Sequence, residues 1–423
     1  MNYLKEDIYS TPYASSLLER FLRYVKIWST SSSQRADEGI IPSTPQQRDF
    51  ADALSLEMMQ LGFENVQITK NCYVYANIPP SKGYENFPSI CLLSHLDTVE
   101  EVSGKNVNPQ VIKNYDGKTI KLNEGIILDP LSDKELFTAG QNHDTIITSD
   151  GTTLLGADDK AGVSEIMTAL EFLLKNPQIN HGKIEVIFSP DEETGHGMDK
   201  VPLELLQSKQ CYTVDGGNLG ELETECFNAF KSDVIFTGKA KHTGSARPDM
   251  VNAMCMAASF ITNLPRHEMP ETTDGYQGFY APMSISGTIE SASVCIFLRD
   301  FTDEGMEKRK QTVELTAKTV ANNFGGSVKV THSQQYLNMK MGLEKNPAVK
   351  QKLINAYKEA DLNPTFPPIR GGTDGSRLTQ MGIPTPNIFT GGHNFHSRTE
   401  WASLPQMIKA TEVLIQLAIQ WAK

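Results

Sequence analysis

Short, largely apolar runs alternate with helical segments along this chain, and that alternation limits the folds open to it more than any other feature. Unbroken apolar runs of this kind suit strands that are buried on both faces of a sheet. Strands that alternate with helices build parallel or mixed sheets with helices on their faces. The sequence therefore predicts an α/β fold with a mixed sheet. The predicted strands are 90–93, 184–188, 211–214 and 387–390.

Apolar residues that recur at helical spacing mark the helices around this sheet. One such pattern starts at Asp158, a residue type that commonly caps a helix. Thr44 is the expected N-cap of an earlier helix, because Pro45 suits the first helical turn. Further helices are expected over 11–27, 347–360 and 404–421.

A change of pattern near Phe227 predicts an inserted domain. From there to about residue 336 the expected order is β-α-β-β-α-β, the ferredoxin-like α+β arrangement. We therefore expect a main domain in two parts, 1–226 and 337–423, and an inserted domain over 227–336. Within the insert the predicted strands are 231–238, 283–289, 293–299 and 327–332, and the predicted helices are 248–264 and 303–323.

The composition excludes several classes of partner. The chain has 423 residues, with 39 Lys and Arg against 51 Asp and Glu and a net charge of -12. Excess negative charge without a basic cluster argues against nucleic acid and anionic membranes. The sequence shows no apolar leader and no apolar run long enough to span a bilayer. The six cysteines are scattered without CxxC spacing, which favours free thiols and a cytoplasmic protein.

Histidines and carboxylates stand where these predicted elements end or begin. His95, Glu192, Glu193, Asp215 and His396 follow predicted strands, and Asp158 stands at a helix start. Each alone is ordinary, since Asp158 could simply cap its helix and the others could be surface residues. The carboxyl ends of strands in an open α/β sheet share one edge, where ligands bind. Residues far apart in sequence are therefore expected to converge there.

The converging residues form a metal-ligand set. Two histidines with three or four carboxylates and no thiolate suit Zn²⁺, while Mn²⁺ or Co²⁺ remain alternatives. Five ligands exceed what one structural zinc needs and fit two ions about 3.5–4 Å apart. Asp97 could orient the ring of His95, and Glu192 would remain free to act as a general base.

The motifs around these residues resemble those of the dizinc exopeptidase superfamily, and within it the peptidase T family of tripeptide aminopeptidases. The resemblance covers most of the chain and implies a catalytic domain with the insert as a lid. The general motifs are 94–98 (SHLDT), 156–162 (GADDKAG), 190–195 (PDEETG), 214–217 (VDGG) and 394–396 (NFH). Two stretches, 148–158 and 371–376 (GGTDGS), resemble the peptidase T family in particular.

The resemblance also implies roles for single residues. One zinc would be bound by His95, Asp158 and Asp215. The second would be bound by Asp158, Glu193 and His396, so that Asp158 bridges the pair. Glu192 would be the general base, and Asp97 would orient His95. His242 resembles the lid histidine of the family, which can reach the carbonyl oxygen of the scissile bond.

Arg299 and Arg370 are the candidates for binding a substrate carboxylate, because arginine offers a bidentate fork. A structural role for either is an equal alternative. His196, beside the predicted ligands, departs from the family pattern, as do the stretches 33–39 and 141–144. These departures do not touch the predicted ligands.

We therefore expect a zinc aminopeptidase that releases the N-terminal residue of short peptides, above all tripeptides. An N-acyl-amino-acid hydrolase of the same superfamily is the alternative. An inactive binding module would have lost a ligand or Glu192, and none is missing. The expected partner is a short peptide, with no nucleic acid and no membrane, and a homodimer is left open.

Overall fold

The computed structural model describes residues 8–423, which form two compact units. The first comprises the chain up to Thr224 together with Gly342–Pro367 and Thr373–Lys423. The second comprises Glu225–Met341 and the short segment Pro368–Gly372. The second unit thus ends a few residues later than the predicted insert and takes in a segment that the sequence assigned to the main domain.

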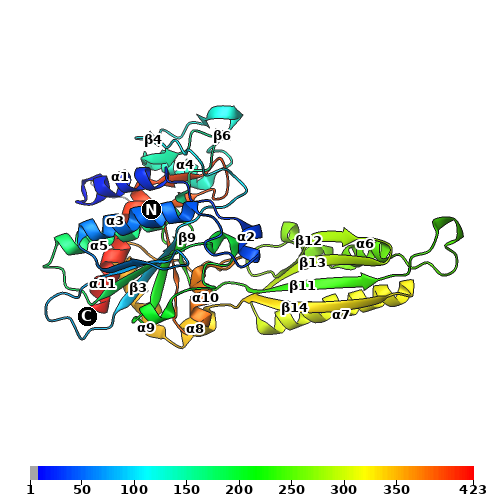
Figure 1. Ribbon diagram of the computed structural model, residues 1–423. Helices are drawn as coiled ribbons and strands as arrows, with labels where there is room; N and C mark the ends of the chain where they lie inside the picture. Colours follow the sequence, from blue (N-terminus) through cyan, green and yellow to red (C-terminus); the bar gives the residue numbers. More distant parts are fainter. Residues whose placement is uncertain (1–7) are drawn as a thin grey trace. The chain divides into compact units, whose positions relative to one another are not determined.

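The first unit is built on a mixed sheet, of which Figure 1 labels β3 and β9. Strands β8, β3, β9 and β15 run parallel in it. Strand β2 pairs antiparallel with β8 and β1 with β2, while β10 adds antiparallel to β15. The predicted mixed α/β fold is confirmed. In sheet order the strands are β1 (Glu64–Ile68), β2 (Val74–Ile78), β8 (Ile184–Ser189), β3 (Ile90–His95), β9 (Cys211–Gly216), β15 (Asn387–Phe389) and β10 (Leu222–Glu223).

Helices cover both faces of this sheet. On one face α5 (Ala157–Lys175) packs against β3 and β9, and α1 (Ala14–Tyr24) and α11 (Leu404–Trp421) pack on α5. On the other face, Leu378 of α10 (Asp374–Gln380) joins the buried side chains of Cys91 and Leu93. The remaining helices include α2 (Ser33–Asp37), α3 (Gln46–Leu61), α8 (Lys340–Glu344) and α9 (Pro347–Glu359).

The start of α3 differs from the prediction. Helix α3 begins at Gln46, Pro45 occupies the N-cap position, and no side chain caps the helix. The Thr44 hydroxyl instead donates to the carbonyl oxygen of Thr30 at 2.6 Å. The expected Thr44 N-cap is therefore wrong, because a tertiary hydrogen bond takes its side chain.

The polar stretch between β3 and α5 is ordered and adds to the first unit. It carries α4 (Lys134–Asn142) and two of the four strands, β7 and β4, of a small antiparallel sheet in the order β16–β17–β7–β4. Leu136, Ile146 and Trp401 are buried in a separate core beneath it. The strands here are β4 (Gln110–Ile112), β5 (Ile120–Lys121), β6 (Ile127–Leu128), β7 (Ile146–Thr148), β16 (Gly392–His393) and β17 (Trp401–Ser403).

The second unit is a four-stranded antiparallel sheet in the order β12–β13–β11–β14 with two helices. Along the chain its elements follow the predicted ferredoxin-like order β-α-β-β-α-β. Helix α6 starts at Ala253, later than predicted, because the Asn252 side chain caps it by accepting from the amides of Met254 and Cys255. The elements are β11 (Asn228–Thr237), α6 (Ala253–Asn263), β12 (Phe279–Gly287), β13 (Ser291–Asp300), α7 (Asp303–Phe324) and β14 (Ser327–Tyr336).

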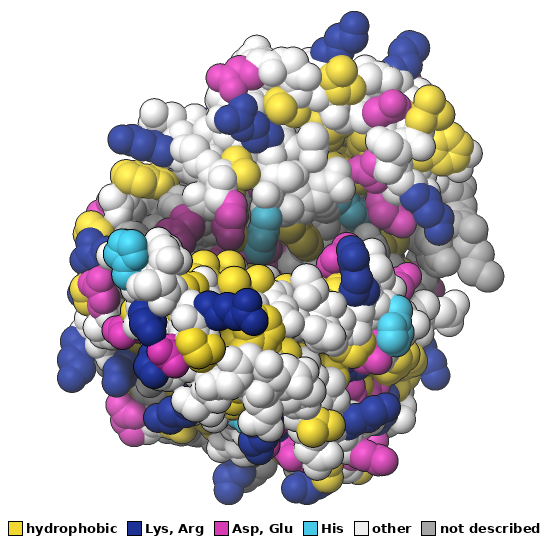
Figure 2. Space-filling view, turned by 90° about the vertical axis from the view of Figure 1, so that its right-hand side faces the viewer, with side chains coloured by type: hydrophobic (Ala, Val, Ile, Leu, Met, Phe, Trp, Pro, Cys, Tyr) yellow, Lys and Arg dark blue, Asp and Glu magenta, His cyan; other side chains and the backbone are white. Residues whose placement is uncertain are grey.

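The distribution of surface charge and the state of the cysteines agree with what the composition indicated. Lys and Arg side chains are interspersed with Asp and Glu on the face in Figure 2 rather than gathered into a basic patch. The six cysteines, all within residues 8–423, form no disulfide, and four of them are buried. None of the helices within residues 8–423 is long and apolar enough to cross a membrane.

Candidate metal centre

The predicted ligands of the first unit come together at one edge of its sheet. His95 is the last residue of β3, and Asp215 lies near the end of β9. Glu192 and Glu193 form the short 3₁₀ turn η3 (Glu192–Thr194) that follows β8. Parallel strands bring these positions together because their carboxyl ends meet at the same edge. Asp158 arrives from the start of α5, and His396 from the loop after β16.

The two oxygens of Asp158 face two different histidines. His95 Nε2 lies 2.8 Å from Asp158 Oδ1 and 3.7 Å from Asp215 Oδ1. His396 Nε2 lies 3.1 Å from Asp158 Oδ2 and 3.1 Å from Glu193 Oε2. The donor atoms therefore separate into two neighbouring groups that share the Asp158 carboxylate.

Glu192 lies among these donors as well. The donor atoms of His95, Glu192 and Asp215 lie within 4.8 Å of one another, as do those of His95, Asp158 and Glu193. Both groups differ from the predicted sets, since Glu192 was no predicted ligand and His95 and Glu193 were assigned to different ions. A base that acts on a water held at this centre also has to lie within reach of the ligands.

The electrostatics of the site fit divalent cations. Burial raises the pKa of Glu193 to about 8, and burial together with Asp215 raises that of Glu192 well above its usual range. Hydrogen bonds to Asp158 and Glu193 raise the pKa of His396 to about 11. Within residues 8–423, Glu193 Oε1 is a buried oxygen without a hydrogen-bond partner. Crowded carboxylates, two imidazoles and an unpaired oxygen are the donors that Zn²⁺ and similar ions take.

Asp97 connects two parts of the site. His95 Nδ1 lies 3.1 Å from the backbone carbonyl oxygen of Asp97 and 3.4 Å from its carboxylate. The same fully buried carboxylate accepts the backbone N–H groups of Glu192 at 3.0 Å and Glu193 at 3.2 Å. Sequence reasoning predicted the contact with His95. The contacts with the Glu192–Glu193 backbone had no signal in the sequence.

A second carboxylate, that of Asp191, helps to fix the Glu192–Glu193 turn. Asp191 has a positive φ of 58° and is fully buried. Its carboxylate accepts from the Ser43 amide at 2.7 Å and from Gln47 Nε2 at 2.6 Å. The Glu192–Glu193 turn is therefore bound to the start of α3 as well as to the segment that follows β3.

His196, the unexpected histidine, belongs to a surface network and not to the ligand set. Its Nδ1 lies 2.7 Å from Asp199 Oδ2 and its Nε2 lies 3.3 Å from Asp37 Oδ1. Arg377 of α10 donates to Asp199 at 2.9 Å. The hydrogen bond to Asp199, with one to Asp37, raises the pKa of His196 above its usual value. The network joins the segment after η3 to α2 and α10.

Two more buried carboxylates, Asp159 and Asp374, surround the centre. Asp159 accepts from the Ser94 hydroxyl and, at 3.2 Å, from the backbone N–H groups of His95 and Gly162. Asp374 accepts from Ser189 Oγ at 2.5 Å. A Cβ on Gly162 would lie 1.9 Å from the carbonyl oxygen of Val214, so α5 approaches β9 closely only because residue 162 is glycine.

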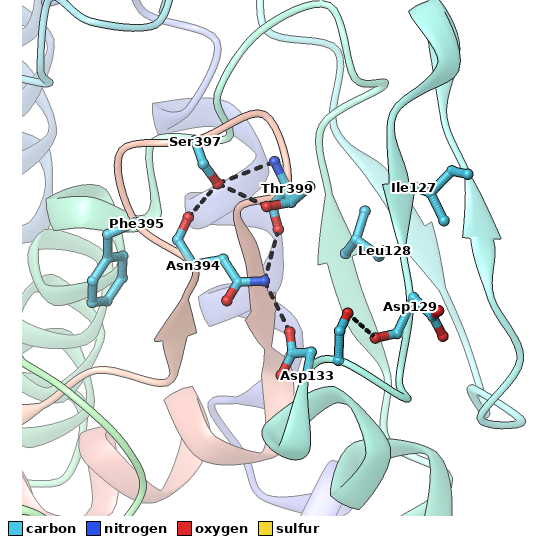
Figure 3. A pocket seen from close by; sticks show the side chains of 9 residues that line it. Ile127, Leu128, Asp129, Asp133, Asn394, Phe395, Ser397 and Thr399 are labelled. Atoms are coloured by element: carbon cyan, nitrogen blue, oxygen red, sulfur yellow. Dashed lines mark hydrogen bonds between the residues drawn. The ribbon is translucent and has the colours of Figure 1, made fainter. Parts of the chain in front are cut away.

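The loop that carries His396 is held by hydrogen bonds to the polar stretch between β3 and α5 (Figure 3). Asn394 Nδ2 donates to Asp133 Oδ2 at 2.9 Å, and Trp401 Nε1 donates to the same oxygen at 3.0 Å. Asp133 is also the N-cap of α4, where it accepts from the Leu136 amide. A pocket of about 360 Å³ lies between this loop and β6. The polar stretch between β3 and α5, to which the sequence analysis gave no role, therefore supports the loop of the candidate ligand His396.

The remaining candidate residues belong to the second unit. His242 is exposed, and its Nδ1 accepts the Gly244 amide at 3.2 Å. Arg370 Nη1 donates to the carbonyl oxygens of Gly275 at 2.7 Å and Gln277 at 2.8 Å. Arg299 Nη1 donates to Gln335 Oε1 at 3.0 Å. Arg370 is thus engaged with a loop of its own unit, which favours the structural alternative for this residue over substrate binding.

The fold and the paired groups of ligands define a metallopeptidase, and the comparisons specify it. Residues 150–420 match the model of peptidase family M20/M25/M40. The chain is 44% identical to peptidase T of Listeria innocua over 405 residues, which are 95% of this chain and 97% of that protein. The chain belongs to peptidase family M20/M25/M40. The resemblance to peptidase T that the motifs indicated is confirmed.

Solved structures share the fold. Aminopeptidase PepT of Bacillus cereus matches with a TM-score of 0.75 and 23% identity, over 97% of this chain and 99% of that one. The YXEP protein of Bacillus subtilis, a dinuclear metal-binding peptidase, matches with a TM-score of 0.66 and 14% identity, over 96% and 98%. The expectation of an enzyme that hydrolyses peptide bonds is confirmed by the family and by the curated relatives.

Proposed function

We propose that this enzyme removes the N-terminal residue from free tripeptides and uses two zinc ions to do so. The observation that carries the proposal is the Asp158 carboxylate, whose two oxygens face His95 and His396 at 2.8 and 3.1 Å. A carboxylate that faces two ligand groups is the usual bridge of a two-metal site. The 44% identity with a peptidase T supports the tripeptide substrate.

In this proposal His95, Asp158 and Asp215 bind one zinc, and Asp158, Glu193 and His396 bind the other. When bound, the ions would lower the pKa of the attacking water and polarise the scissile carbonyl group. Asp97 holds the His95 ring through its backbone oxygen and its carboxylate, which fixes the nitrogen that faces the metal.

Glu192 is the proposed general base. It accepts a proton from the attacking water and passes it to the amine of the leaving peptide. Its side chain lies within the ligand group of His95 and Asp215, and its backbone is held by Asp97. A base fixed by backbone contacts keeps its position while its charge changes during the reaction.

Charge favours a free amine over a blocked one. At least six carboxylates lie in or around the site, and two zinc ions offset only four negative charges. An ammonium group is attracted to such a cluster, whereas an acylated amine is not. The carboxylates are Asp97, Asp158, Asp159, Glu192, Glu193 and Asp215.

Arg299 is the better of the two candidates for binding the far carboxylate of the substrate. Among residues 8–423 its hydrogen bonds all come from Nη1. Its guanidinium also lies 5.0 Å from the ring centre of Phe297 and 5.5 Å from that of Tyr336. A fixed carboxylate binder would limit the length of the peptide.

The proposal places the enzyme in the cytoplasm, where mostly buried cysteines that form no disulfide remain reduced. A homodimer is the assembly to test, by light scattering of the purified protein at several concentrations.

A substrate panel tests the function. Free di-, tri- and tetrapeptides are compared with N-acetylated tripeptides and N-acyl amino acids by kcat/KM, with zinc present. Free tripeptides should be the best substrates, and their N-acetylated forms should be far slower. Higher kcat/KM for the N-acyl compounds would replace the aminopeptidase with the acyl-amino-acid hydrolase alternative.

A further inference from the structure

Glu400 is a buried carboxylate beneath the loop that carries Asp158, and it has no counterpart among the predicted site residues. Its side chain is 1% exposed. Oε2 accepts the backbone N–H groups of Leu155 at 2.8 Å and Gly156 at 2.7 Å. Oε1 accepts the backbone N–H group of Asp158 itself at 3.1 Å. One side chain thus holds three amide donors within four residues of the loop, those of Leu155, Gly156 and Asp158.

These amides need an acceptor from outside their own segment. Gly156 has a positive φ of 82°, and Asp158 and Asp159 have non-helical backbone angles within the first turn assigned to α5. The amides of a helix start have no acceptor within the helix. A carboxylate that accepts two or three backbone N–H groups makes stronger bonds than a neutral acceptor would.

Glu400 also links the two candidate ligand groups. It lies four residues after His396 and directly before β17, and its own amide donates to the carbonyl oxygen of Ser397 at 3.3 Å. The loop of His396 and the loop of Asp158 are therefore joined through one side chain. Their relative placement decides whether Asp158 Oδ2 and His396 Nε2 face one another at 3.1 Å.

Burial of this carboxylate has an electrostatic cost. Glu400 is close enough to Asp158 for the two negative charges to repel. A glutamine would fill the same volume without the extra charge, yet it has only one acceptor oxygen. Placed with that oxygen on the Leu155 and Gly156 amides, it would turn its amino group toward the Asp158 amide, donor against donor.

We infer that Glu400 is a positioning residue that fixes Asp158 as the bridge between the two metal ions. This rests on the metal centre proposed above. The role is separate from catalysis, because Glu400 contacts the backbone of the bridging residue and not the reacting atoms. Its loss should weaken metal binding at both positions, since both depend on Asp158.

The test is metal affinity of Glu400→Gln, measured by zinc titration of the apoprotein against a competing chelator. Loss of a residue that supports a metal ligand typically weakens binding about 10–100-fold. The absorption spectrum of the Co²⁺-substituted protein should change as well, because the ligand field depends on the placement of Asp158. Neither measurement depends on enzyme activity.

Glu185 offers a matched control. It is fully buried near the start of β8, at the opposite end of the strand from the site, and it accepts the backbone N–H groups of Gln207 and Ser208 at 3.1 and 2.7 Å. Glu185→Gln therefore removes the same kind of interaction from a loop without ligands. It should lower the melting temperature but leave zinc affinity within about threefold of the wild type, well below the 10–100-fold loss at Glu400.

The outcomes separate this inference from the metal centre itself. If the wild type binds fewer than two ions, the proposed centre is wrong and the role of Glu400 falls with it. If the wild type binds two ions and Glu400→Gln binds them equally well, only the role of Glu400 is wrong. Equal weakening in both variants would also overturn it, as would failure of both Glu400→Gln and Glu400→Asp to fold.

Discussion

Replacement of Glu192 by glutamine should abolish most turnover and leave metal binding intact. The turn that carries Glu192 does not depend on its side chain, because Asp97 accepts the backbone N–H groups of Glu192 and Glu193 at 3.0 and 3.2 Å. Glutamine has nearly the same shape and cannot take the proton. General base catalysis contributes about 10²–10⁴ in rate, so the barrier should rise by about 2.7–5.4 kcal/mol at 1.36 kcal/mol per factor of ten.

Glu193→Gln is the matched control for that experiment. Glu193 Oε2 lies 3.1 Å from His396 Nε2, within one of the two ligand groups. An amide is a weaker ligand than a carboxylate, so this variant should lose zinc and regain part of its activity when zinc is added in excess. The assay is kcat and KM on a free tripeptide, combined with elemental analysis of bound metal. Turnover near the wild-type rate in Glu192→Gln would refute the assignment of the base.

Three further outcomes are expected. Asp158→Ala should lose both zinc ions, since both groups share that carboxylate, and elemental analysis finding one tightly held ion in the wild type would contradict the two-metal centre. His242→Ala should lower kcat about 10²–10³-fold if His242 stabilises the oxyanion, whereas a change in KM alone would limit its role to binding. Hydrogen bonds to Asp199 and Asp37 raise the pKa of His196, so its contribution to stability is fully present below pH about 6.5 and is lost as pH rises through the raised pKa. Melting temperatures from pH 5.5 to 8.5 should accordingly show the wild type exceeding His196→Gln most at the acidic end, and a constant gap would contradict that reasoning.

The sequence predicted most elements whose pattern reflects burial, although it missed the fully buried strand β2. Helix α11 was expected over 404–421 and spans those residues, because its apolar face repeats without interruption. Strands β3, β8 and β9 are buried along most of their length and show as apolar runs. Strand β1 was not predicted, since it lies at the sheet edge, is mostly exposed and reads Glu-Asn-Val-Gln-Ile.

Tertiary contacts explain most of the differences at element ends. The start of α6 depends on Asn252, whose side chain caps the helix five residues after the predicted start. Thr44 does not cap its helix as predicted, because its hydroxyl donates a hydrogen bond to the carbonyl oxygen of Thr30. A short polar residue can cap a helix or bond elsewhere, and the choice depends on neighbours that are distant in sequence.

The donor residues of the site were accessible to sequence reasoning because of where they stand. His95, Glu193 and Asp215 follow buried strands, and the ends of parallel strands converge in any sheet of this class. His396 also follows a predicted strand, and Asp158 stands at the start of a predicted helix. The structure brings these five residues together. Their positions at the ends of elements were enough to predict this, without knowledge of the contacts among them.

Asp97 was predicted to orient His95, but the backbone contacts of the supporting carboxylates could not be recognised in the same way, and the reason is physical. Asp97, Asp159 and Glu400 act on backbone N–H groups, which every residue possesses, so their partners leave no mark on the sequence. Each adds a buried negative charge beside a site that is already acidic. A neutral acceptor would avoid that repulsion but would hold the amides less strongly. Two divalent cations reverse the balance, because the same negative charges then attract what the site binds. The ligand loops are therefore fixed by groups that the protein tolerates best when metal is bound, so that precise geometry and metal affinity depend on the same carboxylates.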